Sequence, residues 1–238
     1  MFGRFLEFAV ATQDIAASVQ FYERLGFAQL PTSDAWRHRY GVLGDGRIHI
    51  GLHERTMASP SICFVLPELR QARVRLAAAG LEPEVARLGE EELHQMQLRD
   101  PGGQAITLLE ARTYSPAAPP AGGESLCGYF LHLSLPEADL ERAREFWERA
   151  GFVALEAVEE PYAHIPLTSD RLDLAFHARR LIDAPLLVFE CGDWAATRTR
   201  LEALGITPSA DFPRGADRRH SGLIEAPEGT LLWMLGGV

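Results

Sequence analysis

Two pairs of ionisable residues stand in short alternating stretches of the sequence, and their types are those that ligate metals or transfer protons. Glu7 and His49 form the first pair, and His132 and Asp173 form the second. The immediate neighbours of each residue are apolar, which is typical of a β-strand with one buried face. We therefore expect each pair on the opposite face, where it either meets a small ligand or forms an inert structural pair.

Smaller and aromatic side chains are expected on the same face. Alternation places Cys63 and Thr107 there in the first half of the chain, and Trp233 in the second. Tyr40 and His164 occupy matching positions on other strands, where they could stack on a planar ligand. Alternation leaves open whether Tyr40 or its neighbour His38 faces inward, and likewise whether His164 or Tyr162 does.

Imidazole groups also recur at His53 and His177, near the ends of two matching strands. They are interpreted as rim or structural residues, although histidine titrates near neutral pH. The expected surface combines a polar wall with a small or apolar one. Such a surface suits a small amphipathic organic ligand.

The chain repeats itself. The segment from Asp14 matches the segment from Asp139 at an offset of 125 residues, and two later pairs of segments match at offsets of 124 and 126. Four helical patterns end in a glycine at spacings of 54, 71 and 54 residues, and glycine there supplies the left-handed residue that ends a helix. Acids near the expected helix starts stand at Asp14, Glu68, Asp139 and Asp193. The pattern predicts an α+β fold of four βαβββ modules.

Domain boundaries follow from the repeat. A stretch rich in Pro, Gly, Ala and Ser, with no apolar periodicity, is interpreted as a linker. We predict a first domain at 1–112 with modules at about 4–55 and 60–112, a linker at 113–126, and a second domain at 127–238 with modules at about 129–179 and 185–237.

A motif in the first half resembles the vicinal oxygen chelate superfamily, which includes glyoxalase I, bleomycin-resistance proteins and extradiol dioxygenases. It consists of an apolar strand followed by Asp14, Ser18, Phe21-Tyr22 and Leu25-Gly26-Phe27, and of an Asp-Pro-Gly-Gly turn at 100–103 before the closing strand. The resemblance implies paired modules in two domains, each with a curved sheet around a cleft and helices on the outside. It also implies a metal in the cleft, with ligands from the start of a module's first strand and the middle of its last.

The implied metal shell is incomplete. Catalytic zinc or non-haem iron typically has three protein ligands. At the family's positions Glu7 and His49 are candidates in one domain, and His132 and Asp173 in the other. The remaining positions hold Ser61 and Thr107, which are weak donors, or Leu186 and Trp233, which cannot coordinate a metal. No cofactor is certain, and Zn, Ni, Mn or Fe stays possible.

Composition excludes several functions. The formal charge is −10, and all 23 basic residues are Arg, so no lysine is present for a Schiff base or a P-loop. An acidic chain without a basic tract is not expected to bind nucleic acid, and no stretch reaches the roughly 18 apolar residues of a membrane span. Three widely spaced cysteines are expected to be reduced thiols of a cytoplasmic protein. The protein is expected to be either a monomer or a homodimer.

Our first hypothesis is a protein of the glyoxalase or bleomycin-resistance type that binds a small organic ligand without a complete metal site. The alternative is a metal-dependent lyase or dioxygenase that uses one of the two ionisable pairs. A further alternative is a regulatory or interaction module without a ligand.

Overall fold

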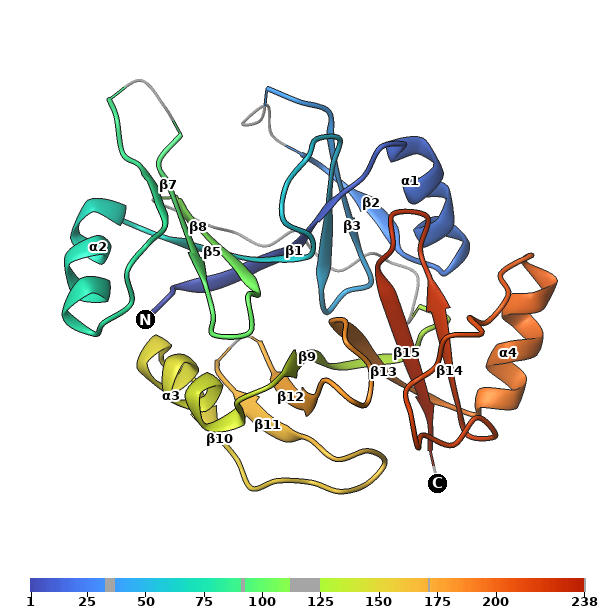
Figure 1. Cartoon of the computed structure of the whole chain (residues 1–238). Helices are drawn as coiled ribbons and strands as arrows, with labels where there is room; N and C mark the ends of the chain where they lie inside the picture. Colours follow the sequence, from blue (N-terminus) through green and yellow to red (C-terminus); the bar gives the residue numbers. More distant parts are fainter. Residues whose placement is uncertain (33–36, 91–92, 112–124, 171, 238) are drawn as a thin grey trace.

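The computed structural model describes residues 1–32, 37–90, 93–111, 125–170 and 172–237. Two mixed sheets are built from consecutive parts of the chain (Figure 1). The first has the order β2-β3-β4-β1-β5-β8-β7-β6, and the second has the order β10-β11-β12-β9-β13-β15-β14. The strands of the N-terminal sheet are β1 (Arg4–Ala11), β2 (Ala28–Leu30), β3 (Tyr40–Gly44), β4 (His49–His53), β5 (Ser61–Leu66), β6 (Val85–Arg87), β7 (Gln95–Arg99) and β8 (Ala105–Glu110).

The C-terminal sheet lacks one strand of the repeat. Its strands are β9 (Tyr129–Glu137), β10 (Val153–Ala154), β11 (Ile165–Thr168), β12 (Leu174–Ala178), β13 (Leu186–Gly192), β14 (Ser221–Glu225) and β15 (Leu231–Gly236). The fourth module thus has two strands after its helix where the repeat predicts three. Pro213 lies in the segment between that helix and β14, and proline has no backbone N–H to donate to a sheet.

Strand pairing joins the modules in twos. Within each module the first strand pairs in parallel with the last, as β1 with β4, β5 with β8, β9 with β12 and β13 with β15. The first strands of neighbouring modules then pair antiparallel, β1 with β5 and β9 with β13. The predicted α+β fold with paired modules is confirmed. The proposed domain boundaries stay a prediction, and most of the predicted linker lies outside the described residues.

The helices begin and end largely as the sequence predicts. They are α1 (Ile15–Arg24), α2 (Leu69–Ala78), α3 (Leu140–Ala150) and α4 (Trp194–Ala203). Asp14, Asp139 and Asp193 each accept a backbone N–H of the first turn. At α2 the expected acid, Glu68, caps nothing with its side chain, and the Glu110 carboxylate accepts the Leu69 N–H instead at 2.8 Å.

All four helices end in the same way. The predicted glycines, Gly26, Gly80, Gly151 and Gly205, have positive φ angles of 93°, 71°, 104° and 72°. The residue after each glycine donates its backbone N–H to a carbonyl five residues earlier, at 2.9 to 3.0 Å. This hydrogen bond is the Schellman closure that a left-handed glycine permits.

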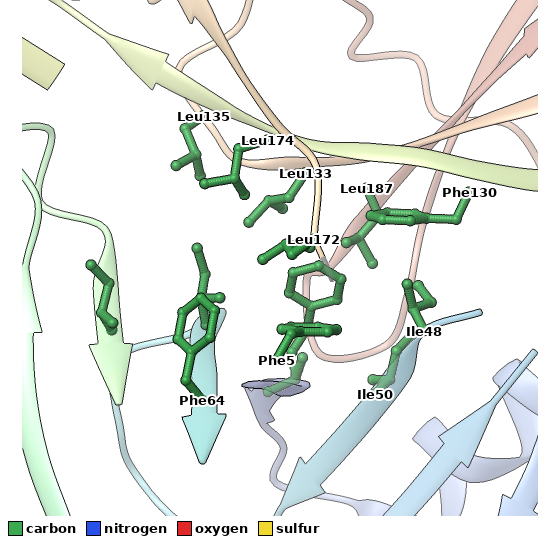
Figure 2. Packing of buried hydrophobic residues seen from close by; sticks show 14 of the residues in the cluster. Phe5, Ile48, Ile50, Phe64, Phe130, Leu133, Leu135, Leu172, Leu174 and Leu187 are labelled. Atoms are coloured by element: carbon green, nitrogen blue, oxygen red, sulfur yellow. The ribbon is translucent and has the colours of Figure 1, made fainter. Parts of the chain in front are cut away.

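One apolar core joins the two sheets. The apolar faces of β1, β4 and β5 point toward those of β9, β12 and β13, and Figure 2 shows the meeting side chains, among them Phe5, Ile50, Leu133 and Leu174. The helices flank this layer, with α1 and α4 at one end of the view and α2 and α3 at the other (Figure 1). Each sheet therefore has an inner face in the shared core and an outer face that is turned away from the other sheet. In the described part of the chain, no helix is long and apolar enough to cross a bilayer.

A shared core predicts that the two halves unfold together. Ile50→Ala and Leu133→Ala remove fully buried side chains from opposite sheets, and each is expected to lower the free energy of unfolding by roughly 2–5 kcal/mol. Urea unfolding, followed by both tryptophan fluorescence and far-UV circular dichroism, should show one transition that both variants shift. Val74→Ala, at a residue 70% exposed on α2, serves as the control and is expected to change stability by less than about 0.5 kcal/mol. Two separate transitions, each shifted by only one variant, would contradict the shared core.

Candidate functional site

A chain of four hydrogen-bonded side chains occupies the outer face of the N-terminal sheet. The Glu7 carboxylate, only 1% exposed, accepts the Tyr40 hydroxyl at 2.5 Å and lies 3.2 Å from Nε2 of His53. Nδ1 of His53 lies 2.9 Å from Nε2 of His38. If His53 donates through Nε2 to the carboxylate, its Nδ1 accepts from His38, so both nitrogens are used. The chain connects a buried carboxylate with an imidazole that is partly exposed.

Gly51 makes room for this arrangement. It pairs with Ala9 in the register of β1 and β4, and it carries no side chain above the Glu7 carboxyl. A Cβ placed there would lie 2.3 Å from the Glu7 carboxyl carbon, which is far inside van der Waals contact. The glycine thus lets Glu7 reach across β4 to residues that are not its sheet neighbours.

The predicted partner of Glu7 was wrong. His49 is half-exposed on β4, and its ring lies beside Gly44. Glu7 meets Tyr40 and His53 instead, because Gly51 opens the space toward the far end of β4. His53, interpreted from the sequence as a rim or structural residue, is 3% exposed and central to the chain.

The small residues predicted on this face do lie beside Glu7. Cys63 is opposite Glu7 in the register of β1 and β5, and Thr107 follows on β8. Thr107 shares a hydrogen bond of 3.0 Å with the hydroxyl of Ser61. Burial, and then the Glu7 carboxylate, raises the pKa of the Cys63 thiol well above its ordinary value, so it is not a reactive thiolate.

A second chain occupies the equivalent positions of the C-terminal sheet. Nε2 of His177 lies 2.9 Å from the Ile182 carbonyl, which can only accept, so this nitrogen is the donor. Nδ1 of His177 then accepts from Ser134 at 2.8 Å, and the Tyr162 hydroxyl donates to Ser134 at 3.1 Å. The Tyr162 oxygen consequently accepts from Nε2 of His132 at 2.5 Å. The carbonyl thus fixes the direction of every hydrogen bond in the chain.

His132 is held neutral in this surrounding. Burial, and then the neighbouring His164 and His177, lowers its pKa to about 3. His164 donates from Nδ1 to the Tyr162 carbonyl at 2.8 Å, and its ring stacks on Tyr162 with centroids 4.3 Å apart. His164 also lies beside His132, with the two ring centroids 5.2 Å apart.

The two chains share three of their positions, while Ser134 of the second chain corresponds to Ala9 and His164 stacks on Tyr162 without joining the chain. Glu7 and His132, His38 and Tyr162, Tyr40 and His164, and His53 and His177 are related by the repeat offsets of 125 or 124 residues. Sequence reasoning named His38 and Tyr162 only as alternatives to Tyr40 and His164, because alternation did not settle which residue of each pair faces inward. Their matching positions in the repeat, two residues before Tyr40 and His164, were the signal that could have added them to the candidate site.

Asp173 does not join His132. Its side chain is exposed ahead of β12, and only its backbone carbonyl reaches β9, where it accepts the Leu133 N–H at 3.2 Å. The two residues are close in register, but the Asp173 side chain points to solvent while His132 donates to Tyr162. The predicted pairing of His132 with Asp173 is thus not formed.

The donor atoms do not fit a three-ligand metal centre. Both nitrogens of His53 are engaged, and Nε2 of His132 carries a proton that it donates. Leu186 and Trp233, at the remaining positions of the C-terminal sheet, offer no ligand atom. Among the described residues, no three His, Cys, Asp or Glu side chains are grouped so that they could hold an ion.

Trp233 fills the outer face of the C-terminal sheet. It is fully buried, with its ring 4.7 Å from that of Tyr162 and 6.4 Å from that of Phe212. Its indole Nε1 has no hydrogen-bond partner among the described residues. Leu186 and Val188 complete a small apolar cluster with Trp233, so the wall opposite the His132–Tyr162 chain is apolar, as expected from the sequence.

A cavity of about 490 Å³ opens over Tyr162. Its polar rim includes Glu159, Arg180 and Arg214, while Ala163 and Leu181 contribute apolar surface. The residue that links His132 to Ser134 is thus one of those that line the cavity. The cavity offers space for a ligand next to the C-terminal chain.

Comparison with known proteins identifies the architecture. Over 99% of the chain and 92% of the other protein, a catechol 2,3-dioxygenase superposes with a TM-score of 0.61 at 18% identity. The 2,3-dioxygenase LapB from Pseudomonas sp. KL28 gives 0.63 at 19% identity, covering 98% of this chain and 92% of that one. The chain has the fold of the vicinal oxygen chelate superfamily.

Other superpositions agree with this fold. Homoprotocatechuate 2,3-dioxygenase from Brevibacterium fuscum gives a TM-score of 0.65 at 16% identity, over 99% of this chain and 71% of that one. No protein-family model and no curated protein matches the sequence. At these identities the vicinal oxygen chelate fold is shown, while the reaction is not.

The space beside Gly51 gives a direct test of the N-terminal chain. Gly51→Ala is expected to displace the Glu7 carboxyl and to lower the free energy of unfolding by roughly 1–3 kcal/mol, because the new methyl group overpacks a buried site. Gly41→Ala on β3 is the control, since its Cβ would meet only a methyl of Ile15 at an ordinary 3.7 Å. Urea unfolding of both variants checks the expectation. Equal midpoints for the two variants would show that Gly51 does not hold this space for Glu7.

Proposed function

We propose that this protein binds a small amphipathic organic molecule on the vicinal oxygen chelate scaffold without using a metal ion. The observation that carries the proposal is the direction of the hydrogen bonds in the C-terminal chain. The Ile182 carbonyl makes Nε2 of His132 a donor to Tyr162, so the histidine at the family's ligand position holds an internal hydrogen bond. Leu186 and Trp233 leave it without companion ligands.

The cavity over Tyr162 supports the character of the ligand. Its volume of about 490 Å³ lies within the range of small-molecule sites, which are mostly apolar with a few placed polar groups. Tyr162 lines the cavity, and Arg180 and Arg214 add guanidinium groups to its lining beside the carboxylates of Glu159 and Glu160. A planar molecule with an acidic substituent would meet both kinds of surface.

The hydrogen-bonded chain beside the cavity has a positioning role in this proposal. It fixes the Tyr162 ring through His132 and Ser134, and the stacked His164 ring holds the other side. A ring held in this way needs little reordering when a ligand arrives, which lowers the entropy cost of binding. Neutral His132 adds no charge that the apolar wall would have to solvate.

Ring-cleaving dioxygenase activity is the second candidate, and the fold comparison favours it. One superposed structure is described as a substrate complex of homoprotocatechuate 2,3-dioxygenase with 3,4-dihydroxyphenylacetate. For this chain, such a reaction would require His132 to release its bond to Tyr162 and to gain further ligands. The two candidates therefore differ in their need for a metal.

Metal content separates the two candidates. After incubation with Fe(II), Mn(II) or Zn(II) and desalting, we expect the protein to retain less than about a tenth of an equivalent of each, because three-ligand sites are needed for firm binding. Elemental analysis measures the retained metal, and oxygen uptake with 3,4-dihydroxyphenylacetate measures ring cleavage. Retention near one equivalent, together with oxygen uptake, would favour the dioxygenase and end the first proposal.

Ligand binding is expected to persist in EDTA and to depend on the cavity over Tyr162. Isothermal titration with catechol, benzoate and 3,4-dihydroxyphenylacetate should show binding of at least one of them, and Ala163→Phe should weaken it by roughly tenfold or more by filling the cavity. Arg39→Phe is the matched control, because Arg39 holds the equivalent position of the N-terminal half, 124 residues earlier. Failure of all three compounds to bind, or equal weakening by both variants, would contradict this site.

A further inference from the structure

Two buried carboxyl groups from opposite halves of the chain meet at one end of the shared core. Asp100 begins the turn between β7 and β8, and Glu137 ends β9. They are 4% and 3% exposed. Carboxyl groups are almost never buried to this degree unless they are paired. The contact is separate from both outer faces and from the cavity over Tyr162.

Asp100 already has two N–H donors. Its Oδ1 accepts the backbone N–H of Gln104 at 2.7 Å, and its Oδ2 accepts the indole N–H of Trp147 on α3 at 3.1 Å. Hydrogen bonds of this kind stabilise the ionised form of a carboxyl group. Burial raises the pKa of Asp100, and these hydrogen bonds oppose that shift. Because Asp100 has such donors, we assign it as the ionised member of the pair, and it ties the turn of the N-terminal sheet to a helix of the C-terminal half.

One oxygen of the Glu137 carboxyl group differs in this respect. Its Oε1 is buried without a hydrogen-bond donor among the described residues. The turn packs directly on it, because a Cβ at Gly102 would lie 2.3 Å from this oxygen. Two adjacent ionised carboxylates at a buried contact would repel strongly, and one proton shared between them removes the repulsion.

The charged groups around Glu137 do not neutralise its carboxylate in place of the shared proton. Asp100 and Asp139 are acidic, and the Arg179 guanidinium donates to the Gly102 carbonyl at 3.1 Å and faces Asp183 at 3.7 Å. Arg179 is about half-exposed, so solvent screens its charge. Arg99 and Asp183 line an adjoining cavity of about 370 Å³, and Arg99 pairs with Glu84. Burial, and then Asp100, raises the pKa of Glu137 to about 8.

The other end of the core has an equivalent contact without a second carboxyl group. Glu228, in the turn between β14 and β15, accepts the hydroxyls of Ser18 at 2.8 Å and Tyr22 at 2.7 Å on α1. Tyr22 corresponds to Trp147 at the repeat offset of 125 residues. The Glu228 contact thus serves as an internal control for the effect of the carboxyl pair.

We propose that Asp100 and Glu137 form a proton-dependent clasp between the two halves of the protein. The protonated Glu137 carboxyl donates to the Asp100 carboxylate and holds the β7–β8 turn against β9 and α3. Loss of that proton leaves two facing carboxylates, and the turn separates from α3.

The direction of the pH dependence follows from the folded state holding the proton more tightly than the unfolded chain. The pKa of Glu137 is raised above its ordinary 4.5, so folded protein binds more protons over this interval. Stability from the clasp is therefore complete below about pH 4.5, falls as the pH rises, and is lost above about pH 8.

The test compares wild type with Glu137→Gln, whose amide keeps the shape and a donor for Asp100 but does not titrate. We expect the ratio of their unfolding equilibrium constants to change by roughly 100-fold between about pH 5.5 and about pH 8.5, in favour of the variant at high pH. Urea unfolding at both pH values gives this ratio. Glu228→Gln is the matched control, and its ratio to wild type should change much less.

A local measurement keeps the proposal testable if Glu137→Gln folds poorly. The indole N–H resonance of Trp147, assigned with Trp147→Phe, should titrate in the wild type with a midpoint near pH 8, because the indole bonds to Asp100. If the ratio of the unfolding equilibrium constants of Glu137→Gln and wild type does not change with pH, the proposed clasp is overturned. So does a Trp147 resonance that does not move between about pH 6.5 and about pH 9.5 in the wild type.

Discussion

Burial of the two apolar sheet faces against each other is the constraint on which the rest of this structure depends. A single-layer sheet must cover its apolar face, and here each sheet covers the other while the helices close the flanks. Both hydrogen-bonded chains lie on outer faces, and the Asp100 and Glu228 contacts lie at the ends.

The repeat shows how one scaffold position acquires different electrostatics. In the N-terminal sheet, the first-strand position holds the Glu7 carboxylate, which accepts from a tyrosine and faces a histidine. The same position in the C-terminal sheet holds neutral His132, and the chain below it ends on a carbonyl. The apolar cluster around Trp233 can lie against the second chain because that chain carries no net charge, whereas Glu7 is surrounded by the hydroxyls and thiol of Ser61, Thr107 and Cys63.

Local and periodic features could be predicted from the sequence. The glycines that end the helices, three of the four acids that begin them, and the division of each strand into two faces depend on neighbours within a few residues, so the repeat exposes them. The partner of Glu7 could not be predicted, because it depends on the empty space above Gly51 and on the reach of a long side chain across β4. The missing strand of the fourth module could not be predicted, because the other three modules each have three strands after the helix and the repeat favours the same number in the fourth.

Asp100 illustrates a further limit of sequence reasoning. The Asp-Pro-Gly-Gly turn indicates a tight connection before the last strand, and a turn aspartate ordinarily bonds its own backbone, as Asp100 does with Gln104. Nothing local predicts that its other oxygen receives the Trp147 indole, or that Glu137 lies beside it. Those contacts exist because the shared core brings the turn of one half onto the helix of the other. At the opposite end, the same geometry brings Glu228 onto two hydroxyls. At both ends of the core a turn of one half therefore packs on a helix of the other half, but the polar groups at the two contacts differ. Only the contact with two carboxyl groups needs a bound proton to hold the turn in place.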